Sequence, residues 1–238
     1  MNFGELKTLA RMSVPTAKEN VISNTQLGLI INQATKEIAT NLRFLQADKK
    51  FTIVNDRSEY NITTQISAER YAGIAKSGVW FNEGSVASPD WGELDPVTEK
   101  WLDTNKMNWR DNGSSIPEYY YIKGNSIYLI DKPNADLTDG GWLYYFQHPP
   151  VMSNDSHFPF NSGSTEFSQY SILTDAIILY YKWIAEGIIA EEEKKLTARK
   201  EYLEELTLKG AMLNRRLDIS NNRKNRYQGR KYYATHSR

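Results

Sequence analysis

The sequence predicts an α+β fold: a bundle of long helices from both ends of the chain, a β-rich insertion between them, and an extended basic C-terminal arm. Three observations predict it. Apolar residues recur at three- and four-residue steps near both ends, five of the six tryptophans lie in the middle, and the last stretch is strongly basic. We expect the helical bundle at 1–50 and 164–214, the β-rich insertion at 51–163, and the arm at 215–238.

The first part of the chain predicts one short and one long amphipathic helix. The short helix runs from Phe3 to Met12 and stops before Pro15. The long helix runs from Asn24 to about Ala47, with Ser23 or Asn24 supplying the N-cap oxygen.

Two further long helices are predicted near the other end. One begins with Ser164 as its N-cap, and the other opens on three glutamates and closes on Arg215 and Arg216, so that its charges complement the helix dipole. Three long helices with matching stripes predict a small bundle. The stripes consist of Phe167, Tyr170, Leu173, Ile177, Tyr180, Ile184 and Ile188, then of Leu196, Leu203, Leu206 and Leu213.

The middle of the chain predicts short strands separated by Gly, Pro, Asn and Asp. A two-residue loop at Gly124-Asn125 predicts a tight hairpin. Pro96 to Lys106 predicts one short helix, with Asp95 as N-cap and Pro96 at the first helical position. The predicted strands are 51–54, 59–63, 72–81, 118–123, 126–131 and 141–148.

Composition narrows the class of protein. The chain has 238 residues, enough for a real core, and no cysteine, so disulfides, thiolate zinc sites and a cysteine nucleophile are excluded. The first residues lack the apolar region of a signal peptide. The most apolar stretch, 172–190, carries Asp175, Lys182 and Glu186, so we expect a buried helix and no membrane partner.

Little in the sequence predicts chemistry. Phosphate-binding glycine loops and nucleophile elbows are absent, and the three histidines (His148, His157, His236) lie too far apart for a metal-binding spacing. We therefore expect no enzyme, no catalytic residues, no metal and no cofactor. One alternative stays open, a sugar-binding or sugar-cleaving site made by two tryptophans and neighbouring carboxylates. Its members would be Trp91, Trp101, Asp90, Glu93, Asp95 and Glu99.

Aromatic residues are abundant on strands that we predict to be adjacent. Exposed rings can stack on bases or sugars, but aromatic side chains also fill strand cores and anchor protein interfaces, which we favour here. The set comprises Tyr119, Tyr120, Tyr121, Tyr128, Tyr144, Tyr145 and Phe146.

The zero net charge of the chain conceals a strong asymmetry. Residues 215–238 carry eight basic residues against Asp218 alone, a net charge of +7, so the rest of the chain carries −7. This arm has too little apolar surface to fold on itself, and its charge favours an acidic partner, protein or nucleic acid. The candidate partner-binding residues are Arg223, Lys224, Arg226, Tyr227, Arg230, Lys231, Tyr232 and Tyr233.

Several segments resemble one known family. The segment QLGLIINQATKEIATNLRFL at 26–45, the hairpin around Gly124-Asn125, WLYYFQHP at 142–149 and the helix from Glu166 through Ile184 occur in an order similar to that of head-to-tail adaptor proteins of short-tailed phages. These are the connectors or gatekeepers of the tail tubular protein A type. The likeness covers about 25–215.

The resemblance implies a structural virion protein. Such proteins form a twelve-fold ring beneath the portal vertex, send a C-terminal arm onto the portal protein, and connect it to a tail protein or a next ring. The implied partners are therefore the portal, the tail side, further copies of the chain, and packaged DNA that passes without sequence-specific binding. The implied location is the head-tail interface of the virion, after assembly in the host cytoplasm. The alternative is a nucleic-acid-binding module that uses the basic aromatic tail.

Overall fold

A computed structural model describes residues 1–68, 70–106, 108–110, 114–161, 168–189 and 191–235, without the side chains of 76, 77, 114, 168, 169 and 214–235. The chain divides into two compact units. The helical unit consists of Met1–Phe44 together with Pro149–Arg238, and the β unit is the continuous stretch Leu45–His148. Each unit is described by itself.

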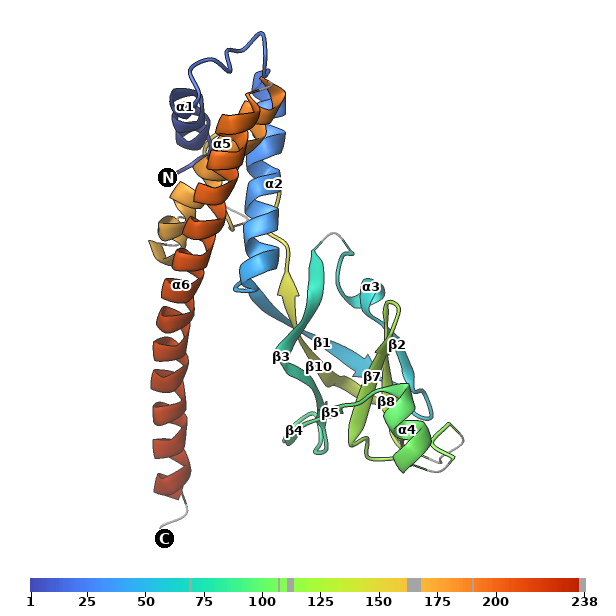
Figure 1. The fold of residues 1–238 in the computed structure, drawn as a ribbon. Coiled ribbons are helices and arrows are strands. Elements are labelled where there is room, and N and C mark those ends of the chain that lie inside the picture. Colours follow the sequence, from blue (N-terminus) through green and yellow to red (C-terminus); the bar gives the residue numbers. More distant parts are fainter. Residues whose placement is uncertain (69, 107, 111–113, 162–167, 190, 236–238) are drawn as a thin grey trace. The chain divides into compact units, whose positions relative to one another are not determined.

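Helix α5 is the centre of the helical unit, since it contacts α1, α2 and α6 (Figure 1). Buried side chains on all four helices form the core, among them Leu6, Ile31, Ile177 and Tyr202. The elements are α1 (Phe3–Ser13), α2 (Asn24–Leu42), the 3₁₀ helix η1 (Ser168–Leu173), α5 (Thr174–Ile188) and α6 (Glu192–Thr235).

Helix α2 begins as predicted and ends early. The Ser23 hydroxyl accepts a hydrogen bond from the backbone N–H of Gln26, so the predicted N-cap is confirmed. The helix ends at Leu42 and not near Ala47, because Arg43 adopts the left-handed conformation with φ of 48°. A strand then begins at Gln46.

The predicted apolar stripe of α6 is only half correct. Leu206 and Leu213 are buried, but Leu196 and Leu203 are exposed. Ala198 and Tyr202 take their places on the buried face, four residues apart. The predicted N-cap Ser164 of the preceding helix and its Phe167 lie outside the described residues.

The prediction of an extended C-terminal arm is wrong. Helix α6 continues without interruption from Glu192 to Thr235, so 215–235 is helical. The poor apolar content of 215–235 argued against folding. However, the preceding turns of α6 are already packed, so these residues extend an existing helix without the cost of nucleating a new one. Arg and Lys also favour helix, and no proline interrupts the stretch.

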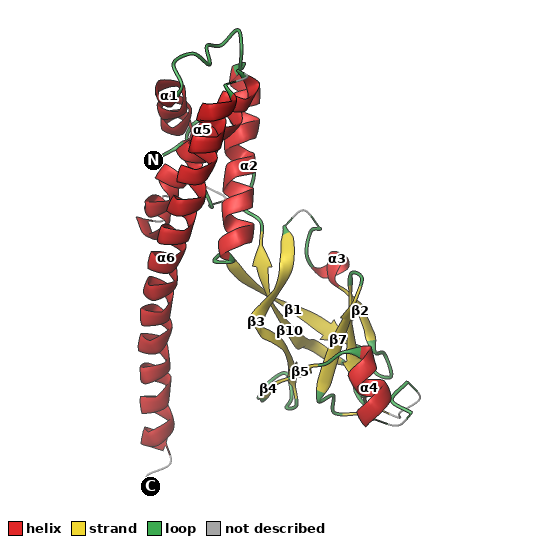
Figure 2. Ribbon diagram, in the orientation of Figure 1, coloured by secondary structure: helices red, strands yellow, loops and turns green. Residues whose placement is uncertain are grey.

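The β unit contains three sheets in its described residues. The first has the order β1-β10-β3-β4 with antiparallel pairs (Figure 2). The second has the order β2-β8-β7-β5, and the third pairs β6 with β9. Two short helices, α3 (Ile62–Gln65) and α4 (Glu99–Asn105), belong to this unit. The strands are β1 (Gln46–Ile53), β2 (Glu59–Asn61), β3 (Tyr71–Asn82), β4 (Trp91–Glu93), β5 (Asp95–Pro96), β6 (Ser114–Ser115), β7 (Tyr119–Lys123), β8 (Ser126–Ile130), β9 (Lys132–Pro133) and β10 (Leu137–Gln147).

The first two sheets share one core. Phe51, Val79 and Leu143 from the first sheet pack in one cluster with Ile127 and Leu129 from the second. Strands β1 and β3 place these residues on one face by alternation, since side chains two residues apart lie on the same side of a strand. The opposite face of the first sheet lies outside this core.

Local turn chemistry predicted the hairpin correctly and the short helix incorrectly. Strands β7 and β8 pair across Gly124-Asn125, which confirms the hairpin. Asp95 and Pro96 form β5, which pairs in parallel with β7, and α4 begins only at Glu99. Its N-cap is Thr98, whose hydroxyl accepts the backbone N–H of Trp101 at 3.1 Å.

As a fold class, the predicted bundle of long helices with an insertion is wrong. The fold is mixed α+β and mostly β-rich, with six α-helices and several sheets in the described residues. Two of those helices, α3 and α4, have four and seven residues and belong to the β unit. The helical periodicity near the chain ends was correctly identified, but it does not define the architecture.

Candidate functional site

Aromatic packing fixes the first half of α6 in the helical unit. Tyr202 is buried, packs edge-on against Tyr180 at 5.3 Å and stacks with Trp183 at 6.0 Å between ring centroids. Its hydroxyl donates to Glu37 Oε1 of α2 at 3.4 Å. Burial raises the pKa of Tyr202, and Glu37 adds to this shift. The three helices α2, α5 and α6 are thus joined at one aromatic cluster.

Close backbone packing continues the anchoring towards Leu213. A Cβ on Gly210 would lie 2.7 Å from Leu42 Cδ2, so α6 approaches the end of α2 closely at this point. Lys209 pairs with Asp175 of α5 at 3.9 Å, and Lys182 of α5 pairs with Glu201 at 2.9 Å. The described side chains therefore hold α6 to the helical unit up to Leu213.

The predicted partner-binding residues follow that anchored part. Their backbone belongs to α6, and their side chains lie outside the described residues. Their ordering as a helix makes the segment shorter than an extended arm: 215–235 spans about 32 Å at about 1.5 Å per residue. The residues concerned are Arg223, Lys224, Arg226, Tyr227, Arg230, Lys231, Tyr232 and Tyr233.

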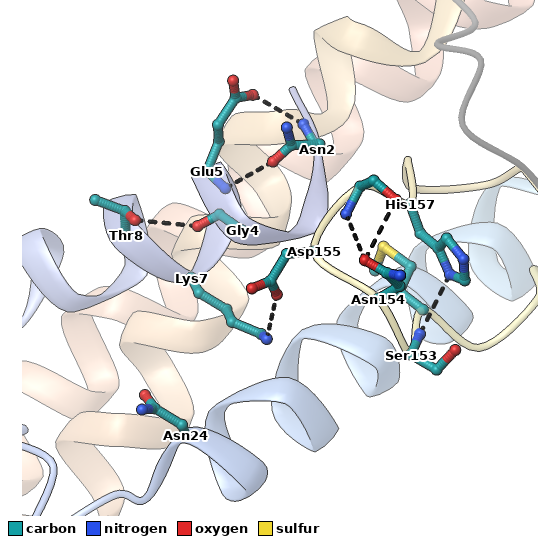
Figure 3. A network of polar contacts seen from close by, with 12 residues as sticks. Asn2, Gly4, Glu5, Lys7, Thr8, Asn24, Ser153, Asn154, Asp155 and His157 are labelled. Atoms are coloured by element: carbon teal, nitrogen blue, oxygen red, sulfur yellow. Dashed lines mark hydrogen bonds and ion pairs between the residues drawn. The ribbon is translucent and has the colours of Figure 1, made fainter.

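A polar network ties the segment after the β unit to the first helix (Figure 3). Asn2 and Glu5 form a capping box at the start of α1, and Lys7 pairs with Asp155 at 2.6 Å. The backbone N–H of Phe3 donates to the carbonyl of His157, whose ring nitrogen Nδ1 accepts from the backbone N–H of Ser153 at 3.3 Å. His157 thus has a structural role in a turn.

The structure separates the residues of the predicted sugar site. Trp91 packs against Trp142 in the first sheet, whereas Trp101 of α4 packs against Tyr119 of the second. Glu99 pairs with Lys123 at 3.0 Å. Glu93 and Asp95 instead line a groove of about 520 Å³ with Glu83 and Glu118, which we call the acidic groove.

The predicted set of aromatic residues divides between core and surface. Strand β10 pairs with β1 and β3 and not with β7 or β8, so the expectation of adjacent strands is wrong for Tyr144, Tyr145 and Phe146. Tyr120 and Tyr145 are buried in the shared core. Tyr121 stacks with Tyr128 at 4.7 Å, where burial raises the pKa of Tyr121 to about 12.

Sequence reasoning missed one aromatic surface. Lys50 lies over the rings of Trp91 and Trp142, at 5.2 and 5.1 Å from their centroids. The Trp142 indole N–H donates to Asp48 Oδ2 at 2.9 Å, and Trp142 also contacts Tyr144. Alternation along WLYYF marks Trp142 and Tyr144 as one face, but the neighbours come from strands distant in sequence.

The described residues offer neither a metal site nor a membrane span. No group of three or more His, Asp or Glu side chains there could hold a metal ion. Likewise, none of the helices in that part of the chain is both long and apolar enough to cross a membrane.

The chain matches a known family. The family model described as SU10 adaptor protein matches residues 1–231, nearly the whole chain. No curated protein matches the sequence. The family match confirms the resemblance to phage head-to-tail adaptors that the sequence segments indicated.

Proposed function

This chain belongs to the SU10 adaptor protein family, and from that membership we propose that it forms an oligomeric ring between the portal and the tail. The family makes the chain a structural adaptor of a phage virion. The finer proposal is a dodecameric ring that docks on the portal protein, offers its other face to a tail or next-ring protein, and surrounds part of the channel for genome ejection.

One observation carries the docking proposal: the most cationic segment of the chain extends a helix that is anchored in the helical unit. Tyr202 and Leu213 are buried in that unit, and the backbone helix continues to Thr235. The +7 charge of 215–238 would attract an acidic portal surface, and repetition around a ring would add avidity. We assign portal contact to Arg223, Lys224, Arg226, Tyr227, Arg230, Lys231, Tyr232 and Tyr233.

The charge of the rest of the chain supports the channel proposal. Residues 1–214 carry −7, and a lining without excess positive charge would let DNA pass without capture of its phosphates. We propose a division of labour in which the helical unit holds the basic segment and the β unit contributes contacts within the ring or with the tail. Assembly would take place in the host cytoplasm. No catalytic step enters this role.

Deletion of residues 218–238 tests the docking proposal. We expect the truncated chain to lose binding to preassembled portal rings, measured by electron microscopy or co-sedimentation. Portal docking at full-length levels by the truncated chain would contradict the proposal.

A charge-reversal pair sharpens the test. Arg223→Glu, Arg226→Glu and Arg230→Glu together should abolish docking. The control, Lys18→Glu, Lys36→Glu and Lys200→Glu, makes the same change in net charge at exposed positions of the helical unit and should dock normally. Equal losses in both variants would show that only the overall charge matters. The same variants titrated with oligonucleotides at rising salt test the nucleic-acid alternative.

A further inference from the structure

The outer face of the first sheet carries aromatic residues where polar ones are expected. In antiparallel sheets the face away from the core usually faces water and is polar. Here Trp80 alternates with buried Val79 and Phe81, while Trp142 and Tyr144 flank buried Leu143. We call Trp80, Trp91, Trp142 and Tyr144 the outer aromatic face.

The rings of this face form one continuous surface. Trp91 contacts Trp142 at 5.2 Å, Trp142 contacts Tyr144 at 4.9 Å, and Tyr144 contacts Trp80 at 6.4 Å between centroids. All four are partly exposed. Contiguous aromatic surface of this kind is typical of sites that bind another molecule.

The face already accommodates a cation. The ammonium group of Lys50 lies within 5.2 Å of the centroids of both Trp91 and Trp142. The faces of indole rings carry partial negative charge and attract Lys and Arg. Asp48 beside Trp142 adds a carboxylate to the same surface.

The acidic groove begins at the same edge strand. In β4, Trp91 belongs to the outer aromatic face and Glu93 lines the groove, with only Gly92 between them. A Cβ on Gly92 would lie 2.5 Å from Glu83 Oε1, so the glycine leaves room for that carboxylate. Glu83, Glu93, Asp95 and Glu118 are all exposed, and none pairs with a basic side chain in the part of the chain that the structure describes.

We propose that the outer aromatic face and the acidic groove together bind the basic C-terminal segment, 215–238, of a second copy of this chain. The two surfaces are complementary in charge and in residue type: carboxylates and indole rings on one, Arg, Lys and Tyr on the other. Each copy would donate one segment and accept another, so that free copies associate head to tail before they meet the portal. The inference rests on the proposed docking of this segment and adds a second site that competes for it.

The same segment cannot occupy the portal and the neighbouring copy with the same residues. The contact between copies therefore belongs to the free adaptor, and the portal competes for the segment. Portal addition should release the neighbour's outer aromatic face to solvent. Exposure of this face when the portal is added would therefore distinguish the contact between copies from portal docking.

Removal of carboxylates tests the site in the full chain. Glu83→Gln, Glu93→Gln and Glu118→Gln remove three exposed charges with little change in shape, and self-association measured by sedimentation should weaken about tenfold. The matched control, Glu192→Gln, Glu193→Gln and Glu204→Gln, removes three exposed charges from α6 and should associate as the unmodified chain does. Unchanged self-association of the groove variant would overturn the inference.

Cross-linking identifies the occupant. A photoreactive amino acid at Tyr227 in ¹⁵N-labelled chains, mixed with unlabelled chains, should give hybrid cross-links to peptides that contain Trp91 or Trp142. Cross-links within one chain only, or to other surfaces, would overturn the inference. If portal docking still requires 218–238 in that case, only the site between copies fails and the proposed docking stands.

Discussion

The β unit is one continuous stretch closed by its own first and last strands, whereas the helical unit is assembled from two stretches that this whole unit separates. Strands β1 and β10 pair along their lengths, and the backbone N–H of Gln147 donates to the carbonyl of Leu45 at 2.9 Å. The helical unit depends instead on contacts such as Tyr202 to Glu37 and Lys7 to Asp155. The β unit therefore holds together the two chain positions from which the helices extend.

The largest expected effects on stability come from core truncations, which test whether the two units unfold separately. Tyr202→Ala should destabilise the helical unit by about 3–5 kcal/mol, and Leu129→Ala should destabilise the β unit by about 2–5 kcal/mol, since both side chains are buried. In a Trp183→Phe background every remaining tryptophan lies in the β unit. Tryptophan fluorescence then reports that unit during denaturant unfolding, and circular dichroism at 222 nm reports the helices.

Each variant should mainly shift the transition of its own unit. If fluorescence and circular dichroism shifted together in both variants, the chain would unfold as one cooperative unit, which would contradict separate unfolding of the two units.

Substitution of one glycine in each unit should change the stability in opposite directions. A Cβ on Gly141 of β10 would lie 2.3 Å from the Phe51 ring, so Gly141→Ala should cost about 1–3 kcal/mol of stability. In α5 a Cβ on Gly187 would meet only the flexible side chain of Lys195 at 3.3 Å, so Gly187→Ala should stabilise by up to about 1 kcal/mol. Thermal unfolding of both variants measures the difference, and destabilisation by Gly187→Ala would contradict it.

A third prediction concerns the joint between the two stretches of the helical unit. Asn32 donates to the Met152 carbonyl at 3.1 Å and accepts from the Met152 N–H at 2.8 Å. Asn32→Ala should cost about 1–3 kcal/mol, because two partly buried groups lose partners. Lys7→Ala, which removes an exposed ion pair, should cost under about 1 kcal/mol and serves as the control. Equal costs in urea unfolding would contradict this ranking.

The smallest expected effect is the pH dependence that Tyr180 contributes to the stability of the helical unit. Burial raises the pKa of Tyr180 to about 12, and Glu37 adds to the shift, whereas the ordinary value is 10.0. The folded state therefore keeps this proton more tightly, and the resulting stability is present below pH 10 and lost as pH rises towards 12. Tyr180→Phe should lose less stability between pH 9 and pH 11 than the unmodified chain. An identical loss in both would contradict the assignment.

Local signals in the sequence predicted the elements better than their arrangement. The N-cap at Ser23 and the hairpin at Gly124-Asn125 follow from short-range chemistry, and both are confirmed. The predicted helix start at Asp95-Pro96 is wrong, because these residues form β5 and pair in parallel with β7. The predicted end of α2 is wrong, because the apolar pattern continues through Leu45. The helix itself ends at Leu42, where Arg43 leaves the helical conformation.

The surfaces relevant to function depended on register that the sequence does not reveal. The pairing of Lys50 with Trp142 and of Trp142 with Trp80 joins strands from distant parts of the chain. Alternation alone could mark Trp142 as outward, but it could not supply Lys50 or Trp91 as neighbours. The basic segment was identified from charge alone, while its helical backbone depends on the packed turns before it.

Mass photometry of the full chain, alone and with portal rings, tests the central claim most directly. We predict that portal rings bind the chain in a fixed number of copies per ring, twelve according to the resemblance, and that the chain lacking 218–238 does not bind. A chain that ignores the portal, or binds it equally well without its basic end, would contradict the proposed adaptor.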